Sequence, residues 1–79
     1  MHNIIEATPL KNTVLHLRFD DGKVFDVDFK PFIRSGVSAA LSDADFFSQV
    51  RVEEGYITWP NGYDFCPEFL YTYAEEHQL

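Results

Sequence analysis

Apolar and polar residues alternate along two neighbouring stretches in the first part of the chain, residues 13–19 and 23–29. Alternation with a period of two is typical of a strand that buries one face. The Asp21-Gly22 pair between the stretches favours a tight turn, because glycine accepts the positive φ that such turns require. The pattern therefore predicts a β-hairpin. Its apolar face would consist of Leu15, Leu17, Phe19, Phe25, Val27 and Phe29.

Shorter helix and strand signals lie on both sides of this hairpin. Residues 3–10 predict a first strand that ends near Pro9, and residues 31–36 predict a short helix between Pro31 and Gly36. Ser42 is the expected N-cap of a further helical turn, whose first residues are acidic, as a helix N-terminus favours. The side chains expected to pack inward from that turn are Phe46 and Phe47.

The last thirty residues contain two reversals and a helix. Residues 50–59 predict two strands joined by a tight turn at Glu54-Gly55, and Gly62 in the segment WPNGYDF is expected to adopt the left-handed conformation. Residues 63–65 form a short returning strand, and Pro67 suits the first position of a C-terminal helix. The buried stripe of that helix would consist of Leu70, Tyr73, Ala74 and His77.

These elements predict a single small α+β domain over residues 1–79. We expect an antiparallel sheet of about five strands, with a short central helical segment and a C-terminal helix packed on the sheet. The apolar fraction of 46% and the aromatic fraction of 16% are enough for a packed core in a chain of this size.

The net charge of −7 is unevenly distributed, since residues 52–79 carry six acids and no lysine or arginine. Phosphate backbones are bound by clustered cations, so direct binding to nucleic acid is not expected. The acidic half is either a solvated surface or a docking face for a basic partner. No apolar run is long enough to cross a membrane, no signal peptide is evident, and one cysteine, Cys66, allows no internal disulfide. We therefore expect a cytoplasmic protein.

Three segments resemble, in order, a small bacterial family known as domain of unknown function 2442. They are LHLRFDDGKVFDVDFKPFI, LSDADFFSQVRVE and ITWPNGYDFCPEFLY. The resemblance implies a small α+β domain, which in some relatives carries an added helix-turn-helix. It also implies that stand-alone members are often encoded beside another small protein, in an arrangement similar to a toxin–antitoxin pair. The family brings no established activity and no catalytic residue.

Candidate ligating and reactive residues have ordinary structural explanations. Cys66 precedes the last helix, where a thiol can be activated, but an inert and partly buried cysteine is the simpler interpretation. The three histidines lack metal-ligand spacing, and the acidic residues around the hairpin lack a calcium-loop pattern. We therefore expect no metal, no cofactor and no catalytic residue. The residues considered were His2, His16, His77, Asp20, Asp21, Asp26 and Asp28.

The expected function is a non-enzymatic protein-interaction module, antitoxin-like or regulatory, that binds a small partner protein through the acidic C-terminal half. Trp59 is either core or a partner contact, Tyr63 lies next to it, and Tyr71 falls off the buried stripe and should be exposed. The residues considered for partner binding are Trp59, Tyr63, Tyr71, Glu68 and Glu75. The alternative is a small-molecule or metal-sensing regulatory domain, in one version a homodimer with a pocket near Trp59 and Tyr63.

Overall fold

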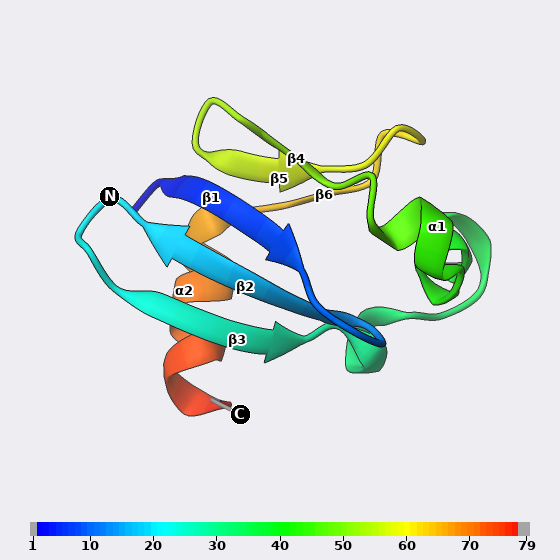
Figure 1. Ribbon diagram of the computed structural model, residues 1–79, viewed down its shortest axis with the longest axis horizontal. Helices are drawn as coiled ribbons and strands as arrows, with labels where there is room; N and C mark the ends of the chain where they lie inside the picture. Colours follow the sequence, from blue (N-terminus) through cyan, green and yellow to red (C-terminus); the bar gives the residue numbers. More distant parts are fainter. Residues whose placement is uncertain (1, 78–79) are drawn as a thin grey trace.

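The computed structural model describes residues 2–77, which form two antiparallel sheets, a central helical segment and a C-terminal helix (Figure 1). The first sheet has the order β1-β2-β3, with strands Ile4–Pro9, Val14–Phe19 and Val24–Asp28. The second has the order β4-β5-β6, with strands Arg51–Glu53, Tyr56–Thr58 and Asp64–Phe65. Between the sheets come the 3-10 helices η1 (Lys30–Phe32) and η2 (Gly36–Ser42) and the helix α1 (Ala44–Phe47), and the chain ends with α2 (Pro67–Glu76). The α+β class is confirmed.

The expectation of about five strands in one sheet is wrong, because six strands divide between two sheets. The division falls at β1, where the register with β2 shifts between Ile4 and Glu6 and leaves Ile5 as the extra residue of a bulge. Pro9, on the same strand, has no N–H to offer a further strand. Outside the two ladders, the described backbone of β1 is joined to the β4–β5 hairpin by one hydrogen bond, from the N–H of Ile4 to the carbonyl of Gly55 at 2.8 Å.

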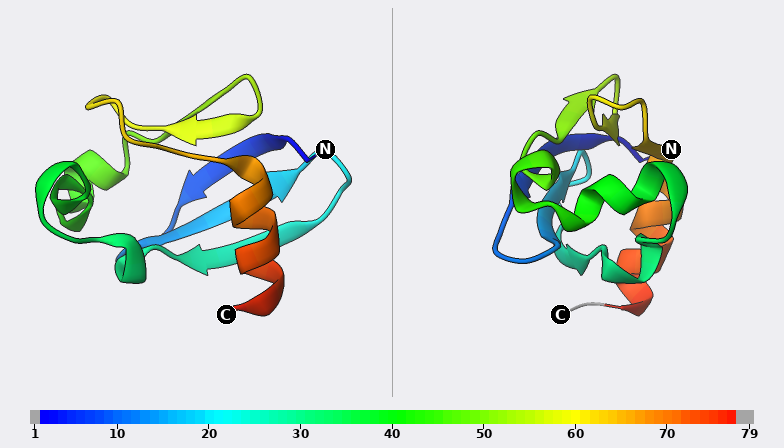
Figure 2. Two further views of the ribbon diagram at one scale, coloured as in Figure 1. Left: turned by 180° about the vertical axis from the view of Figure 1, so that it is seen from behind. Right: turned by 90° about the vertical axis from the view of Figure 1, so that its right-hand side faces the viewer.

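The predicted hairpin and its apolar face are confirmed. Strands β2 and β3 pair in register, with Leu15 opposite Val27 and Leu17 opposite Phe25. All six residues of the predicted face are buried in the common core. Helix α2 lies across that face, as the view from behind shows (Figure 2), and it contributes Leu70, Tyr71 and Ala74 to the core.

Two turns of the same construction follow Phe19 and Trp59. In each turn, the N–H of Phe19 or Trp59 donates to the carbonyl four positions later. The carbonyl of the same residue accepts the N–H of the turn glycine, and all four distances are 2.9–3.0 Å. The middle residue is Asp21 in one turn and Asn61 in the other, and its side-chain oxygen accepts the N–H two residues on at 3.0 Å. The glycines have φ angles of 90° and 89°. Such Asx-Gly turns give a three-residue hairpin loop, so these two reversals were readable from sequence.

The central segment corrects two boundaries. Gly36 begins η2 and does not end the helix that Pro31 starts, because η1 is only three residues long. Asp43, not Ser42, caps α1: its carboxylate accepts the N–H of Asp45 at 2.9 Å, whereas the Ser42 hydroxyl donates back to the carbonyl of Ala39. Of the two phenylalanines expected to face inward, Phe47 is buried and Phe46 is half-buried.

Candidate functional site

Trp59 belongs to the core. Its side chain is only 2% exposed, and its indole N–H donates to the carbonyl of Phe47 at 3.0 Å. Tyr63 is half-buried, and its ring centroid lies 6.2 Å from that of Trp59. The structural interpretation of Trp59 is therefore correct, and in this conformation its indole offers a partner almost no surface.

The expectation that Tyr71 is exposed is wrong. It is 7% exposed, and its hydroxyl donates to Asp21 Oδ2 at 2.6 Å. The ring of His2 stacks on it with centroids 3.6 Å apart, and the ring of Phe19 meets it edge-on at 4.9 Å. Helical periodicity alone misplaced this residue, because the chain that covers it comes from the other end of the sequence. The predicted stripe ends before His77, which is exposed and stacks on Tyr73.

Tyr71 and the polar residues around it form a cluster that we call the N-terminal clamp. Its members are His2, Asp21, Lys23, Glu68, Tyr71 and Glu75. The backbone N–H of His2 donates to the carboxylate of Glu68, and His2 Nδ1 lies 3.0 Å from Glu68 Oε1. Lys23 Nζ lies 3.6 Å from Glu75 Oε2. The clamp thus joins the start of the described chain, the β2–β3 turn and α2.

Hydrogen bonding within the clamp shifts the pKa values of four groups. The backbone N–H of His2, followed by its ring, lowers the pKa of Glu68. The Tyr71 hydroxyl, followed by the N–H of Lys23, lowers the pKa of Asp21, and the same bond raises the pKa of Tyr71. Tyr71 in turn raises the pKa of Lys23. Glu68 and Asp21 are therefore held as carboxylates and Tyr71 as a neutral phenol at neutral pH, which suits a structural connection. Glu68 and Glu75 were considered for partner binding, and the structure places both in contacts within the chain.

Cys66 is exposed, which corrects the expectation of partial burial. It is the N-cap residue of α2, but its side chain makes no capping hydrogen bond. A shallow hollow of about 270 Å³ lies beside it, lined by Tyr56, Asp64, Phe65, Cys66 and Pro67. The described residues around this hollow give no indication of a ligand.

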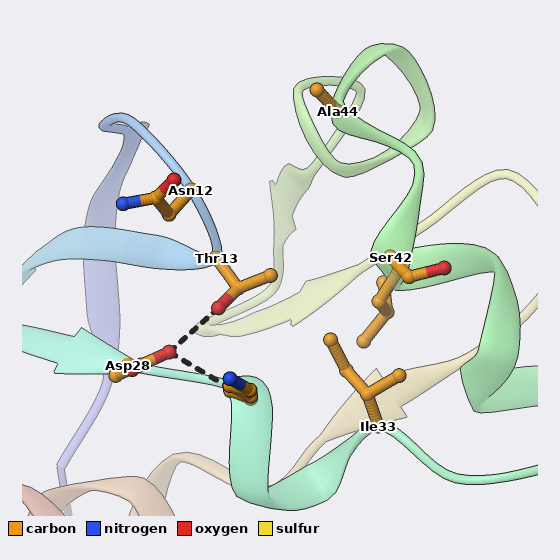
Figure 3. A pocket seen from close by; sticks show the side chains of 8 residues that line it. Asn12, Thr13, Asp28, Ile33, Ser42 and Ala44 are labelled. Atoms are coloured by element: carbon orange, nitrogen blue, oxygen red, sulfur yellow. Dashed lines mark hydrogen bonds between the residues drawn. The ribbon is translucent and has the colours of Figure 1, made fainter.

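A larger hollow of about 810 Å³ opens between the β1–β2 turn, the end of β3 and the central segment (Figure 3). Asp28 lies at its edge, where Oδ1 accepts the Thr13 hydroxyl at 2.6 Å and the backbone N–H of Lys30 at 2.9 Å. Apolar side chains face it from the other side, with Ile33 pointing inward. Its lining residues are Asn12, Thr13, Asp28, Lys30, Ile33, Leu41, Ser42 and Ala44.

The first sheet has a second side that no helix within residues 2–77 covers. Helix α2 lies behind the sheet, and the side toward the viewer in Figure 1 is open. Ile5 and Val24 are 55% and 47% exposed on this side. We call it the outer face, and the strand registers place on it Ile5, Glu6, Thr8, Val14, His16, Arg18, Val24, Asp26 and Asp28.

Polar side-chain pairs lie between the apolar residues of the outer face. His16 Nδ1 lies 2.6 Å from Asp26 Oδ1 across β2 and β3, and Arg18 Nε lies 3.3 Å from Glu6 Oε1 across β2 and β1. Apolar residues set among polar pairs are suited to contact with another protein, because both kinds of group can be matched by a partner. The sequence had left open whether this face meets water or another chain.

Two other classes of site were searched for in the part of the chain that the structure describes. Within residues 2–77, no group of three or more His, Cys, Asp or Glu side chains is placed to hold a metal ion. None of the helices in that range has the length and apolar character needed to span a bilayer.

The fold and the outer face define a small α+β domain with one open sheet surface. The chain belongs to the family described as "Protein of unknown function (DUF2442)", whose pattern matches residues 4–76. The resemblance seen in the sequence is thereby confirmed. No curated protein and no solved structure matched the chain.

Proposed function

We propose that this protein is a non-enzymatic interaction module, antitoxin-like or regulatory, that binds a small partner protein on the outer face of its first sheet. The observation that carries the proposal is the open sheet surface with Ile5 and Val24 exposed on it. Apolar side chains of this size gain about 1.5–3 kcal/mol each when a contact removes them fully from water.

The charge of the chain favours a basic partner. Three acids of the C-terminal half, Glu53, Glu68 and Glu75, already face a base within the chain. The other three, Glu54, Asp64 and Glu76, have no ion pair with a described residue, but they lie apart in the fold, in the β4–β5 turn, on β6 and on α2. The acidic half is therefore a source of long-range attraction, which raises association rates, and the docking surface lies elsewhere.

The arrangement of the clamp supports a role without catalysis. The Tyr71 hydroxyl donates to Asp21, and Glu68 and Glu75 contact His2 and Lys23. A general acid or base must instead reach a substrate. Trp59 and Tyr71 contribute to packing. Trp59 and Tyr71 thus stabilise the fold, and the outer face of the first sheet remains available for binding.

Co-expression with any small protein encoded beside this one tests the proposal. We expect a complex that survives size-exclusion chromatography and dissociates with a Kd at or below the micromolar range. Val24→Ser on the outer face should weaken binding by about tenfold, which corresponds to about 1.4 kcal/mol. Phe69→Ser is the matched control, because Phe69 is 48% exposed but lies on α2. If the two proteins do not associate at micromolar concentration, or if only the control variant weakens binding, the proposal is wrong.

A second candidate function, a small-molecule-sensing domain, is favoured by the hollow in Figure 3. Its volume lies within the range of ligand pockets. Three of the six lysines and arginines, Lys11, Lys30 and Arg34, have no ion pair with a described residue. Lys30 lines this hollow, and Lys11 lines the groove beside it. These cations suit an anionic ligand with an apolar portion.

Thermal-shift screening with small carboxylates and phosphate esters distinguishes this candidate. A ligand at 100 times its Kd would stabilise the protein by about 2.7 kcal/mol. Ala44→Leu should remove the shift, because Ala44 lines the hollow, whereas Ala39→Leu on the exposed side of η2 should keep it. Equal shifts in both variants would place the ligand elsewhere.

A further inference from the structure

We infer that the free edge of β3 receives an extended, lysine- or arginine-bearing segment of the partner as a fourth strand of the first sheet. The inference rests on the proposed interaction function and adds to it the mode of binding and the chemistry of the bound segment. Strand addition supplies affinity through main-chain hydrogen bonds, and alternate side chains then select the partner.

The hydrogen-bond pattern shows which groups of β3 face outward. Phe19 donates its N–H to the carbonyl of Lys23 at 2.9 Å, and Phe29 donates to the carbonyl of Thr13 at 2.8 Å. In an antiparallel ladder, hydrogen-bonded pairs recur at every second residue. Phe25 and Val27 are therefore bonded to β2. The residues whose N–H and carbonyl groups point away from β2 are Val24, Asp26 and Asp28.

Nothing in the described chain pairs with those groups. Strand β3 is the last strand of its sheet, and helix α2 packs beneath the sheet, not beside it (Figure 2). Val24 and the side chain of Asp26 are nearly half exposed. Within residues 2–77, no backbone hydrogen bond reaches from Val24, Asp26 or Asp28 to another element. The edge is open along its five residues.

Backbone devices that block a sheet edge are missing from β3. The strand contains no proline and no inward-pointing charge, and its register with β2 runs without a bulge. The opposite edge strand, β1, has both a bulge at Ile5 and a proline at Pro9. The one protective feature of β3 is its pair of acidic side chains, Asp26 and Asp28, which reject like-charged strands. An edge with an open backbone and acidic side chains is suited to a strand that carries positive charge.

Charge determines which occupant fits. Centred antiparallel pairing with a second copy would place Asp26 directly opposite Asp26 of that copy. A shift by two residues toward the end of the strand would place Asp26 opposite Asp28, and the opposite shift, which pairs Asp26 with Val24, leaves only part of β3 paired. Like charges directly opposite each other destabilise a pair of strands. A strand that carries Lys or Arg at those positions is stabilised instead, and the net charge of −7 draws it in.

Amide hydrogen exchange of the full chain, measured by NMR, tests the inference. The probe is a short peptide with blocked ends in which lysine and valine alternate. The control has the same charge, but proline replaces valine, so it cannot pair as a strand. In the free protein, the amides of Val24, Asp26 and Asp28 should exchange fast and those of Phe25 and Val27 slowly. The lysine–valine peptide should slow the first three by about tenfold or more, and the control should not.

Two variants with a matched control separate pairing from general attraction. Asp26→Pro removes one outward N–H at a position where no ladder bond is lost, and it should abolish protection of the neighbouring edge amides. Asp26→Lys should reject the lysine–valine peptide and accept a glutamate–valine peptide. Glu6→Lys makes the same charge change on β1 and should leave protection intact. Equal effects of both lysine peptides, or outward amides that are already protected in the free protein, would overturn the inference.

The experiments distinguish a failure of strand addition from a failure of the proposed function. If the partner protein associates while the amides of Val24, Asp26 and Asp28 still exchange fast, the interaction function stands and strand addition is wrong. If the peptide is bound at the edge but the co-expressed protein does not associate, strand addition at the edge is confirmed and the proposed function is wrong.

Discussion

Phe29 is the residue whose replacement tests the packing of this fold most directly. It follows β3 and is fully buried where the first sheet, the second sheet and the central segment meet. Four aromatic rings surround it with centroid distances of 5.0–6.2 Å, and all four are inclined steeply to its plane. They belong to Phe32, Phe47, Trp59 and Phe65. We predict that Phe29→Leu destabilises the protein severely although the side chain stays apolar.

The magnitude follows from these contacts. An edge-to-face aromatic pair contributes about 0.5–1.5 kcal/mol beyond the area that it buries, and a swap of similar volume costs up to about 1.5 kcal/mol in repacking. Because neighbouring contacts are not additive, we expect a total loss of about 2–3 kcal/mol for Phe29→Leu. Truncation to alanine should cost about 3–5 kcal/mol. A domain of this length has a stability of about 4–12 kcal/mol, so the leucine variant folds with a reduced margin.

Urea unfolding followed by the fluorescence of Trp59 measures the loss. Trp59 is the single tryptophan of the chain and is buried, so its emission reports unfolding without a label. Phe69→Leu is the control, since Phe69 is 48% exposed and its ring pairs are with Phe32 and Tyr73. We expect the control to lose less than about 1 kcal/mol. If Phe29→Leu loses no more than Phe69→Leu, the packing argument is refuted.

Three further predictions concern other parts of the fold. Gly55→Ala should destabilise the protein by about 1–3 kcal/mol in the same urea assay, because its φ is 89° and an added Cβ would lie 2.4 Å from Asn3 Oδ1; a midpoint equal to wild type contradicts this. The pKa values of Glu68 and Asp21 are lowered by folding, so their stabilisation is present above the ordinary carboxylate pKa of about 4 and is lost as pH falls through the lower folded values. Urea midpoints from pH 7 to about pH 2 should show this loss, and Glu68→Gln should have a shallower acid slope. Cys66 should react with a thiol reagent in the folded state without prior unfolding, and a reaction limited by the unfolding rate would contradict its exposure.

Local patterns predicted the hairpins and the turns well. Alternation placed Leu15, Leu17 and their partners on the buried face, and the Asx-Gly pairs marked both three-residue loops. These features depend on residues close together in sequence, whose conformational preferences act locally. The division into two sheets was not predicted, because it depends on the bulge at Ile5. A bulge is defined by the register of two strands, and no single residue in the sequence marked it.

Long-range contacts explain the errors at the candidate site. Tyr71 lies off the stripe that helical periodicity predicts, yet it is buried because His2 stacks on it from the far end of the sequence. Glu68 and Glu75 are predicted to be available to a partner because the residues that they contact, His2 and Lys23, are distant in sequence. The outer face was visible in the pattern as the second side of the hairpin. Its openness could be established only once α2 was known to cover the other side.

The clamp between His2 and Glu68 has a consequence for how the protein is made. The two residues are separated by 66 positions, so His2 leaves the ribosome long before its carboxylate partner has been synthesised. Strands β2 and β3 can pair as soon as both have emerged, because their contacts are local. Asn3 can bond to Asp20 once β2 has emerged, but the contacts of His2 with Glu68 and Tyr71 have to wait for the final helix. During translation, the segment at His2 is therefore a part that a chaperone or a protease meets before it is held in place.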